Sequence, residues 1–95
     1  MAVAVVVRHK IKDGKLEGFV EYMREMIRLT KLEDGNIAYD LYLSEDGTEE
    51  CIMVELWENR EKLNVHLESE HFKELIPGGA IYQDAPPEIK VYNKL

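Results

Sequence analysis

Apolar residues in this chain switch between the spacing of strands and the spacing of helices. Residues 2–7 form a β-branched run, and apolar residues recur every three or four positions across residues 16–30. Two strand-like runs then flank a turn signal at residues 45–48, and a second helical pattern and a last strand-like segment follow. This order predicts one domain over residues 1–95, with an α+β, ferredoxin-like βαββαβ fold whose antiparallel sheet carries both helices on one face.

Capping and turn residues indicate where these elements begin and end. Gly35 is expected to terminate the first helix, and Asn59 is a good N-cap for the second. Ser69 can cap a further short turn, so we expect the second helix to break near this residue. Residues 76–87 are rich in Gly and Pro, which predicts a long loop that could serve as a lid or an oligomer contact.

Residue parity predicts which strand faces are buried. In the first strand of the hairpin, one face is expected to hold Ile37, Tyr39 and Leu41. The second strand is apolar on both faces, with Cys51, Met53 and Trp57 on one and Ile52, Val54 and Leu56 on the other. Two helices can cover only one sheet face, and a chain of 95 residues buries a thin core. We therefore expect a homodimer in which two copies pack sheet against sheet.

Charge and cysteine content exclude several classes of partner. The formal net charge of −7 would repel phosphate backbones and anionic lipid, so we expect neither nucleic acid nor a membrane as a partner. The first apolar run is too short for a membrane span or a signal segment. Cys51 is the only cysteine, which is typical of a reducing compartment, and we expect a cytoplasmic protein with a buried thiol.

Two histidines in residues 55–72, ELWENREKLNVHLESEHF, are the first candidates for chemistry. His66 has apolar neighbours on its helix face and should point at the sheet, whereas His71 lies further round the helix unless a break at Ser69 redirects it. Helical metal ligands are usually three or four residues apart, so this five-residue spacing is a poor metal site and no metal is expected. Each histidine could equally be a buried, hydrogen-bonded structural residue.

Glu55 and Trp57 project from the same strand face. A carboxylate among apolar residues costs several kcal/mol unless it is paired or neutral, so Glu55 needs a partner, which could be a helix histidine, Arg8 or a backbone N–H group. A pair with a helix histidine would dock the helix on the sheet or tune that histidine as a base. Trp57 could be core or the wall of an aromatic pocket.

Residues 55–72 resemble the signature of the antibiotic biosynthesis monooxygenase (ABM) family of dimeric α+β barrels. The resemblance is carried by Glu55-x-Trp57, by His66, Ser69 and His71 on the following helix, and by Phe72 directly after His71. Upstream, Glu33-x-Gly35 and the following Tyr39 also look like the family pattern. The strand order over nearly the whole chain is that of the family as well.

This resemblance implies a pocket for a small molecule between the helices and the sheet of each subunit. Enzymes of the family include monooxygenases that need no cofactor, because the electron-rich substrate itself activates molecular oxygen. If the matching residues of the family have the same roles here, His66 or His71 would be the catalytic base and Trp57 a pocket wall or hydrogen-bond donor. Substrate would also contact Glu55, Tyr39, Phe72 and Met53.

Departures from the family pattern narrow the expected activity. Anthrone oxygenases have an Asn where this chain has Met53, and haem-degrading relatives have a Trp at the position of His66 and a His where this chain has Ile76. The closest branch is then that of quinol monooxygenases and autoinducer-modifying enzymes. The sequence therefore predicts a cofactor-free monooxygenase for a small quinol-like or cyclic aromatic molecule. The alternatives are an isomerase of the same fold and a non-catalytic dimeric module that binds a small ligand.

Overall fold

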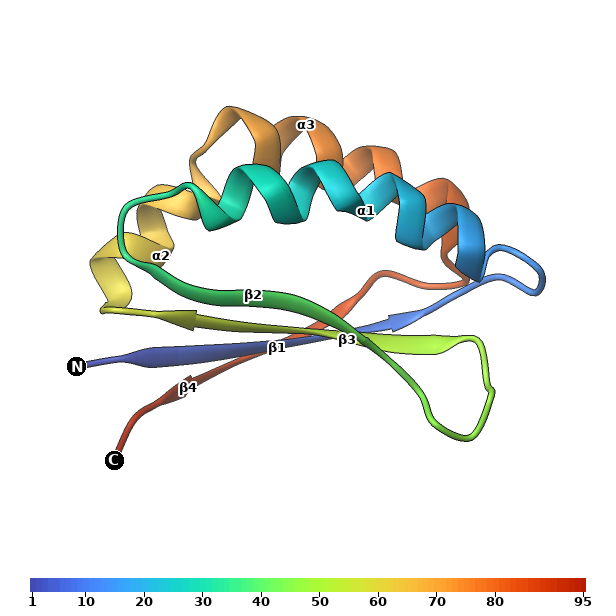
Figure 1. Ribbon diagram of the computed structural model, residues 1–95, viewed down its shortest axis with the longest axis horizontal. Coiled ribbons are helices and arrows are strands. Elements are labelled where there is room, and N and C mark those ends of the chain that lie inside the picture. The colour runs from blue at the N-terminus through green and yellow to red at the C-terminus, as the bar shows by residue number, and fades with distance from the viewer.

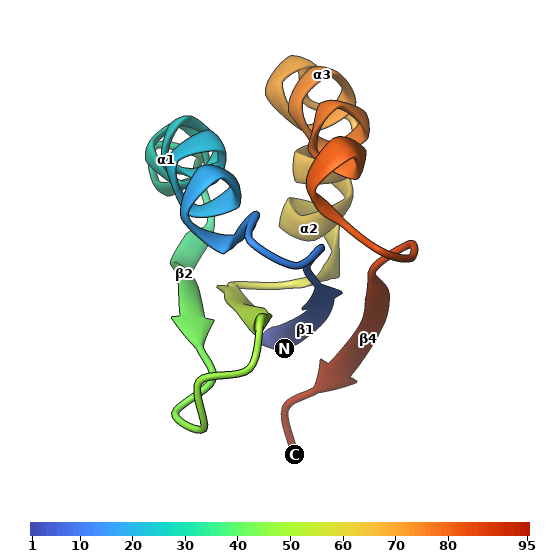
Figure 2. The ribbon, with the colours of Figure 1, turned by 90° about the vertical axis from the view of Figure 1, so that its right-hand side faces the viewer.

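The computed structural model describes Met1–Leu95 and has the predicted architecture. Its elements are β1 (Val3–Lys10), α1 (Leu16–Lys31), β2 (Asn36–Leu43), β3 (Glu50–Trp57), α2 (Arg60–Leu67), α3 (Glu70–Gly78), the 3-10 helix η1 (Gly79–Tyr82) and β4 (Glu88–Asn93). The four strands form one antiparallel sheet in the order β2-β3-β1-β4. All the helices lie on one face of this sheet, as Figures 1 and 2 show. The predicted α+β, ferredoxin-like fold is confirmed.

Strand parity places the core between the sheet and the helices. Val5 lies opposite Glu55, and Val7 lies opposite Met53, so these four side chains share the face beneath the helices. All four are buried. The predicted division of β3 into two faces is therefore confirmed, and it fixes Glu55 on the inner face.

Helix α1 follows the predicted apolar stripe and packs against α3. Phe19, Met23 and Met26 of the stripe are buried. At the contact with α3, a Cβ atom on Gly78 would clash with the Tyr22 hydroxyl, so a larger residue there would displace the Tyr22 side chain. The Tyr22 hydroxyl also donates to the Leu75 carbonyl over 2.7 Å, which ties the two helices together.

The second helix breaks at Ser69, as the sequence predicts. Asn59 caps α2, because its side chain accepts a hydrogen bond from the Lys62 backbone N–H over 2.9 Å. Ser69 caps α3 in the same way by accepting from the Phe72 backbone N–H over 3.3 Å. The chain therefore changes direction between α2 and α3, and this change determines where the two histidines point.

Two sequence predictions about local structure are wrong. The expected loop over residues 76–87 is mostly helical, because α3 continues to Gly78 and η1 follows directly. Pro77 is tolerated near the end of α3, where its fixed φ fits the helix and only one backbone donor is lost. Ile37 does not share the buried face of Tyr39, because a register shift between Asn36 and Ala38 makes it an extra residue, and it is 58% exposed.

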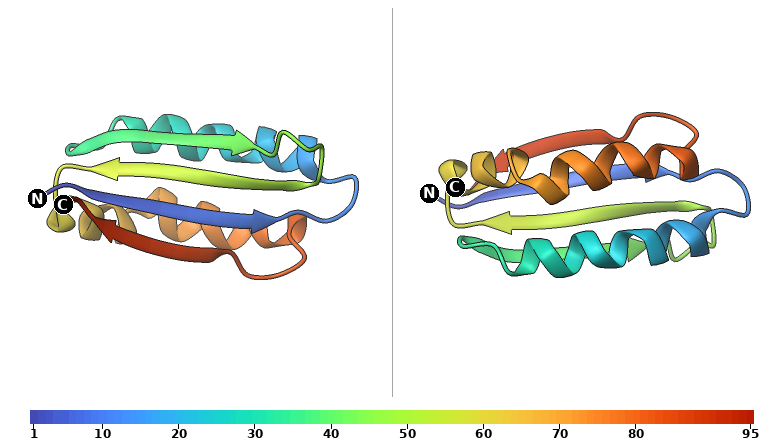
Figure 3. Two further views of the ribbon diagram at one scale, coloured as in Figure 1. Left: turned by 90° about the horizontal axis from the view of Figure 1, so that it is seen from below. Right: turned by 90° about the horizontal axis from the view of Figure 1, so that it is seen from above.

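The outer face of the sheet carries no helix, as seen from below in Figure 3. Its apolar side chains are Ala4, Val6, Ala38, Tyr42, Ile52, Val54, Leu56 and Tyr92, and its charged side chains are Arg8, Lys10, Asp40, Glu50, Glu88 and Lys90. Leu56, Tyr42 and Tyr92 are 37%, 54% and 44% exposed. The homodimer that would cover this face stays a prediction. None of the helices is long and apolar enough to cross a membrane.

Candidate functional site

A largely enclosed cavity lies between the inner sheet face and helices α1 and α3. The centre of a water-sized molecule can occupy about 50 Å³ of it, and it is partly open to solvent. Its thirteen lining residues are Val7, His9, Phe19, Met23, Tyr39, Met53, Glu55, Phe72, Ile76, Gly79, Gln83, Pro87 and Ile89. Eight of these are hydrophobic and none is Lys or Arg. Such a cavity has the apolar lining of a small-molecule site.

Glu55 is a buried carboxyl group in the wall of this cavity. Its side chain is 5% exposed, and one oxygen accepts a hydrogen bond from the Trp57 indole N–H over 3.1 Å. Burial raises the pKa of Glu55 to about 7, against the opposing effect of the Trp57 hydrogen bond. None of the three expected partners is found: Arg8 lies on the other sheet face and pairs with Glu50 and Glu88. The partner is the indole two residues along the same strand.

The structure brings most of the expected substrate contacts to the cavity. Tyr39, Met53, Glu55 and Phe72 border it. Trp57 does not, because its ring is fully buried beside the His66 ring, with 4.7 Å between the centroids. Trp57 reaches the cavity only through its hydrogen bond to Glu55.

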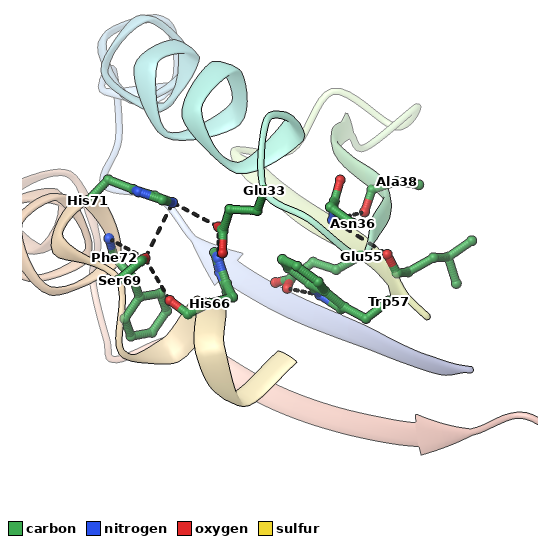
Figure 4. A network of polar contacts seen from close by, with 10 residues as sticks. Glu33, Asn36, Ala38, Glu55, Trp57, His66, Ser69, His71 and Phe72 are labelled. Carbon is green, nitrogen blue, oxygen red and sulfur yellow. Dashed lines mark hydrogen bonds and ion pairs between the residues drawn. The ribbon is translucent and has the colours of Figure 1, made fainter. Parts of the chain in front are cut away.

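His66 and His71 converge on Glu33 rather than on the cavity. His66 Nδ1 lies 2.5 Å and His71 Nε2 lies 2.9 Å from the same oxygen of Glu33, as Figure 4 shows. Ser69 joins this cluster, because its hydroxyl donates to the His66 carbonyl over 2.7 Å and lies 3.3 Å from His71 Nε2. The carboxylate thus accepts an N–H from each ring, and the cluster joins the end of α1 to α2 and α3.

Glu33 is held by a tightly packed turn after α1. Gly35 has a φ of +89°, and a Cβ atom there would clash with the Lys62 side chain, so the position favours glycine on two grounds. Lys62 of α2 in turn pairs with Asp34 over 2.5 Å. Sequence reasoning identified Glu33 and Gly35 as part of a motif and did not predict that Glu33 is the partner of both histidines.

The second ring nitrogen of His66 has no partner. With Nδ1 donating to Glu33, Nε2 is a buried acceptor without a hydrogen bond, in a side chain that is 1% exposed. The ring lies against Tyr39 and Phe72, at centroid distances of 5.6 and 5.2 Å, and both of these residues line the cavity. Burial lowers the pKa of His66 against the raising effect of Glu33, so the ring is neutral at pH 7.

Glu33, His66 and His71 also have the composition of a metal site. Their ligand atoms all lie within 4.8 Å of one another, and two imidazoles with a carboxylate suit a divalent transition metal. The five-residue spacing that argued against such a site is overcome by the break at Ser69. Two hydrogen bonds nevertheless account fully for this contact, and the predicted absence of a metal remains a prediction.

His9 and Gln83 are cavity residues that sequence reasoning missed. His9 is 4% exposed, and its Nδ1 lies 2.9 Å from the Gln83 side-chain oxygen. Its ring packs on Phe19 with 5.0 Å between the centroids. The available signal was parity, since His9 continues the series Val3, Val5 and Val7 on the inner face of β1.

Known proteins resemble the chain in sequence and in fold. Residues 2–77 match the antibiotic biosynthesis monooxygenase (ABM) family. The uncharacterised protein sll1783 of Synechocystis is 30% identical over 83 residues, which cover 87% of this chain and 56% of that protein. YcnE of Bacillus subtilis, named as a candidate monooxygenase, is 26% identical over 80 residues, which cover 84% of each chain.

The same relationship is visible in three dimensions. The crystal structure of a conserved protein from Methanosarcina mazei Go1 superposes with a TM-score of 0.95 and 32% sequence identity, over 100% of this chain and 94% of that one. This likeness extends over every element that surrounds the cavity and the Glu33 cluster. The chain spans little more than half the length of its Synechocystis relative. It spans most of the length of the proteins from Bacillus subtilis and Methanosarcina mazei. It belongs to the antibiotic biosynthesis monooxygenase family.

Proposed function

We propose that the protein is a cofactor-independent monooxygenase that oxidises a small, electron-rich, quinol-like aromatic molecule in the cavity above Glu55. The observation that carries this proposal is a buried carboxyl group that faces an apolar, largely enclosed cavity and has no cationic partner. Its pKa of about 7 suits a group that must accept a proton near neutral pH. The family to which the chain belongs supports the same class of reaction.

In the proposed reaction, Glu55 removes the proton of a ring hydroxyl group. The resulting anion is rich enough in electrons to reduce molecular oxygen directly. A quinol and O₂ then give a hydroxyquinone and water: one oxygen atom enters the ring, the other leaves as water, and the ring supplies all four electrons. The proton taken up by Glu55 returns to the departing oxygen, so the carboxylate is regenerated.

The rest of the cavity contributes by excluding water. Its apolar wall, including Phe19, Met53 and Phe72, would hold a flat aromatic ring and admit O₂. Exclusion of water also protects reactive oxygenated intermediates from side reactions. The protein then needs only to deprotonate, desolvate and orient its substrate.

His66 is the second candidate for the base. Its Nε2 is unpartnered and lies in a ring that contacts two cavity residues, so a small movement of Phe72 would bring it to the substrate. His71 is proposed to act through Glu33, which holds both rings in place. Glu55 is preferred because it already borders the cavity and His66 does not.

We further propose that the active form is a homodimer in the cytoplasm. The outer sheet face exposes apolar side chains, among them Tyr42, Leu56 and Tyr92, and a second copy packed sheet against sheet would bury them. The single cysteine, Cys51, is buried and its pKa is raised by burial to about 11, so it would persist as a thiol in that compartment. Light scattering at micromolar concentration should give the mass of two chains, and a monomer would overturn this part of the proposal.

Oxygen uptake with a panel of reduced quinones tests the activity. Protein freed of metal and flavin should consume O₂ above background with at least one quinol. Glu55→Gln should lower kcat/KM by about 10²-fold, because it removes a general base and keeps an acceptor for the Trp57 indole. The matched control is Glu58→Gln, which changes an exposed carboxylate on the same segment.

Three outcomes separate the remaining alternatives. Equal rates in wild type and Glu55→Gln, with loss of activity in a folded His66→Gln variant, would move the role of base to His66. Conversion of a ligand without oxygen consumption would identify an isomerase. Binding without any conversion would leave a small-molecule-binding module and would refute the enzyme proposal.

A further inference from the structure

We infer that the cavity holds its ligand at two opposite ends, with Glu55 at one hydroxyl group and His9 at another, so that His9 selects ligands that carry a second, distal hydroxyl group. This inference rests on the proposed function for the nature of the reaction. It goes beyond that function by assigning a second polar contact and the relative position of two hydroxyl groups on the ligand.

The two groups lie on one sheet face and far apart along it. Glu55 of β3 is opposite Val5 of β1, and His9 is four residues further along β1. Four residues of strand span about 13 Å, so the two side chains reach the cavity from opposite ends. Val7 and Met53 lie between them on the same face, and both line the cavity. The polar groups are thus separated by an apolar floor.

The hydrogen bonds of Gln83 determine which way His9 presents its ring. Gln83 donates its side-chain N–H to the Gly79 carbonyl over 3.3 Å, so its oxygen is the atom facing His9. That oxygen can only accept, and His9 must therefore carry its proton on Nδ1. Nε2 is then left as an acceptor, and it has no partner within the protein.

Both ends of the cavity consequently accept hydrogen bonds rather than donate them. Burial lowers the pKa of His9 against the effect of Gln83, which keeps the imidazole neutral and Nε2 free to accept. Glu55 accepts at the other end once it is ionised. No Lys or Arg lines the cavity, so a carboxylate or phosphate on the ligand would be buried without a counter-charge.

A ligand that suits this arrangement donates a hydrogen bond from each end of a flat apolar body. A para-quinol does so with its two hydroxyl groups. His9 would act as a positioning residue: by holding the distal hydroxyl it would fix the other one at Glu55. It would also discriminate against aromatic alcohols with a single hydroxyl group.

Anaerobic calorimetry with two ligands tests this assignment without requiring turnover. The ligands are 1,4-dihydroxynaphthalene and 1-naphthol, which differ by the distal hydroxyl. One hydrogen bond of about 1 kcal/mol corresponds to a ratio of dissociation constants of about fivefold to tenfold, so wild type should bind the diol that much more tightly.

Two variants of His9 form a matched pair. His9→Asn retains a donor for Gln83 and removes the Nε2 acceptor, so the ratio should fall to about one. His9→Gln places an amide near the former Nε2 and should restore part of the ratio. Wild type that binds both ligands equally, or a folded His9→Asn variant that still prefers the diol, would overturn the inference.

Failure of this inference is distinguishable from failure of the proposed function. A preference for the diol that depends on His9 would support the inference even if no quinol consumed oxygen. Oxygen uptake that depends on Glu55, with no discrimination by His9, would support the proposed function and refute the inference.

Discussion

The cavity and the Glu33 cluster use the same kinds of side chain in opposite ways. In the cluster, one carboxylate accepts a hydrogen bond from each of two imidazoles, and only His66 Nε2 is left without a partner. In the cavity, Glu55 receives only the Trp57 indole N–H, and His9 is bonded at one nitrogen. Polar groups that satisfy each other hold helices together, whereas polar groups left partly free in an apolar cavity remain available to a ligand.

Mutations in the cluster should lower the stability of the protein, because the cluster holds the end of α1 to α2 and α3. Glu33→Ala would leave two ring N–H donors without their acceptor, one of them on the fully buried His66, and should lower the free energy of unfolding by about 3 kcal/mol. Urea denaturation measures this effect. The control, Glu25→Ala, breaks an exposed pair with Arg28 and should leave stability nearly unchanged. Equal losses of unfolding free energy in the two variants would show that the cluster does not hold the helices together.

For the cavity, the expected effect is a pH dependence of stability that comes from Glu55. The pKa of Glu55 is raised from 4.5 to about 7 in the folded protein. Between these values the folded state keeps a proton that the unfolded state has lost, so wild-type stability falls as the pH rises through this window and levels off above it.

Glu55→Gln removes this titration and isolates its contribution. The stability of the variant relative to wild type should increase by up to about 3 kcal/mol between pH 4.5 and pH 8. Parallel urea titrations of the two proteins across this range provide the measurement. A constant difference at all pH values would mean that Glu55 has an ordinary pKa and that its burial does not perturb its titration.

Trp57 connects the two regions, since it donates to Glu55 and packs on His66. Trp57→Phe removes the hydrogen bond that favours the ionised carboxylate, so the pKa of Glu55 should rise above its wild-type value. The expected cost to the ionised form is about 1.5 kcal/mol, the strength of one hydrogen bond to a charged group. The shift should be visible as a higher midpoint in the pH titration of stability. An unchanged midpoint would mean that the indole does not stabilise the carboxylate.

Ser69 offers the smallest test of the cluster. Ser69→Ala removes the N-cap of α3 together with the hydroxyl next to His71, and should cost about 1 to 2 kcal/mol. Asn59→Ala removes a cap of the same kind from α2 without touching the cluster, and should cost about 1 kcal/mol. Thermal unfolding of the two variants gives the difference. A larger loss of stability for Asn59→Ala would mean that the contact of Ser69 with the cluster adds nothing to its cap.

Local patterns in the sequence were sufficient to predict most of the fold. The α1 stripe, the parity of β3 and the caps Asn59 and Ser69 each depend on interactions within a few residues, and all are present in the structure. The helix through Pro77 and the register shift beside Ile37 were missed. Packing against Tyr22 and pairing with β3 decide these features, and neither contact is local in sequence.

The candidate site was harder to predict for the same reason. Parity correctly placed Glu55 on an inner face, but the partner of the histidines, Glu33, is 33 and 38 residues away from them. His9 and Gln83 are 74 residues apart, and their contact fixes which nitrogen of His9 remains free. A single sequence shows which residue types are present and on which face, whereas the fold decides which polar groups pair and which remain available.

The central claim, that Glu55 is a cavity-facing carboxyl group titrating near neutral pH, is tested most directly by carbon-13 nuclear magnetic resonance of the glutamate Cδ atoms. The Glu55 signal is the one missing from Glu55→Gln. It should titrate with a midpoint near pH 7, in accord with its pKa of about 7, and should shift when 1,4-dihydroxynaphthalene is added without oxygen. A midpoint near the ordinary value of 4.5, with no response to the ligand, would contradict the account.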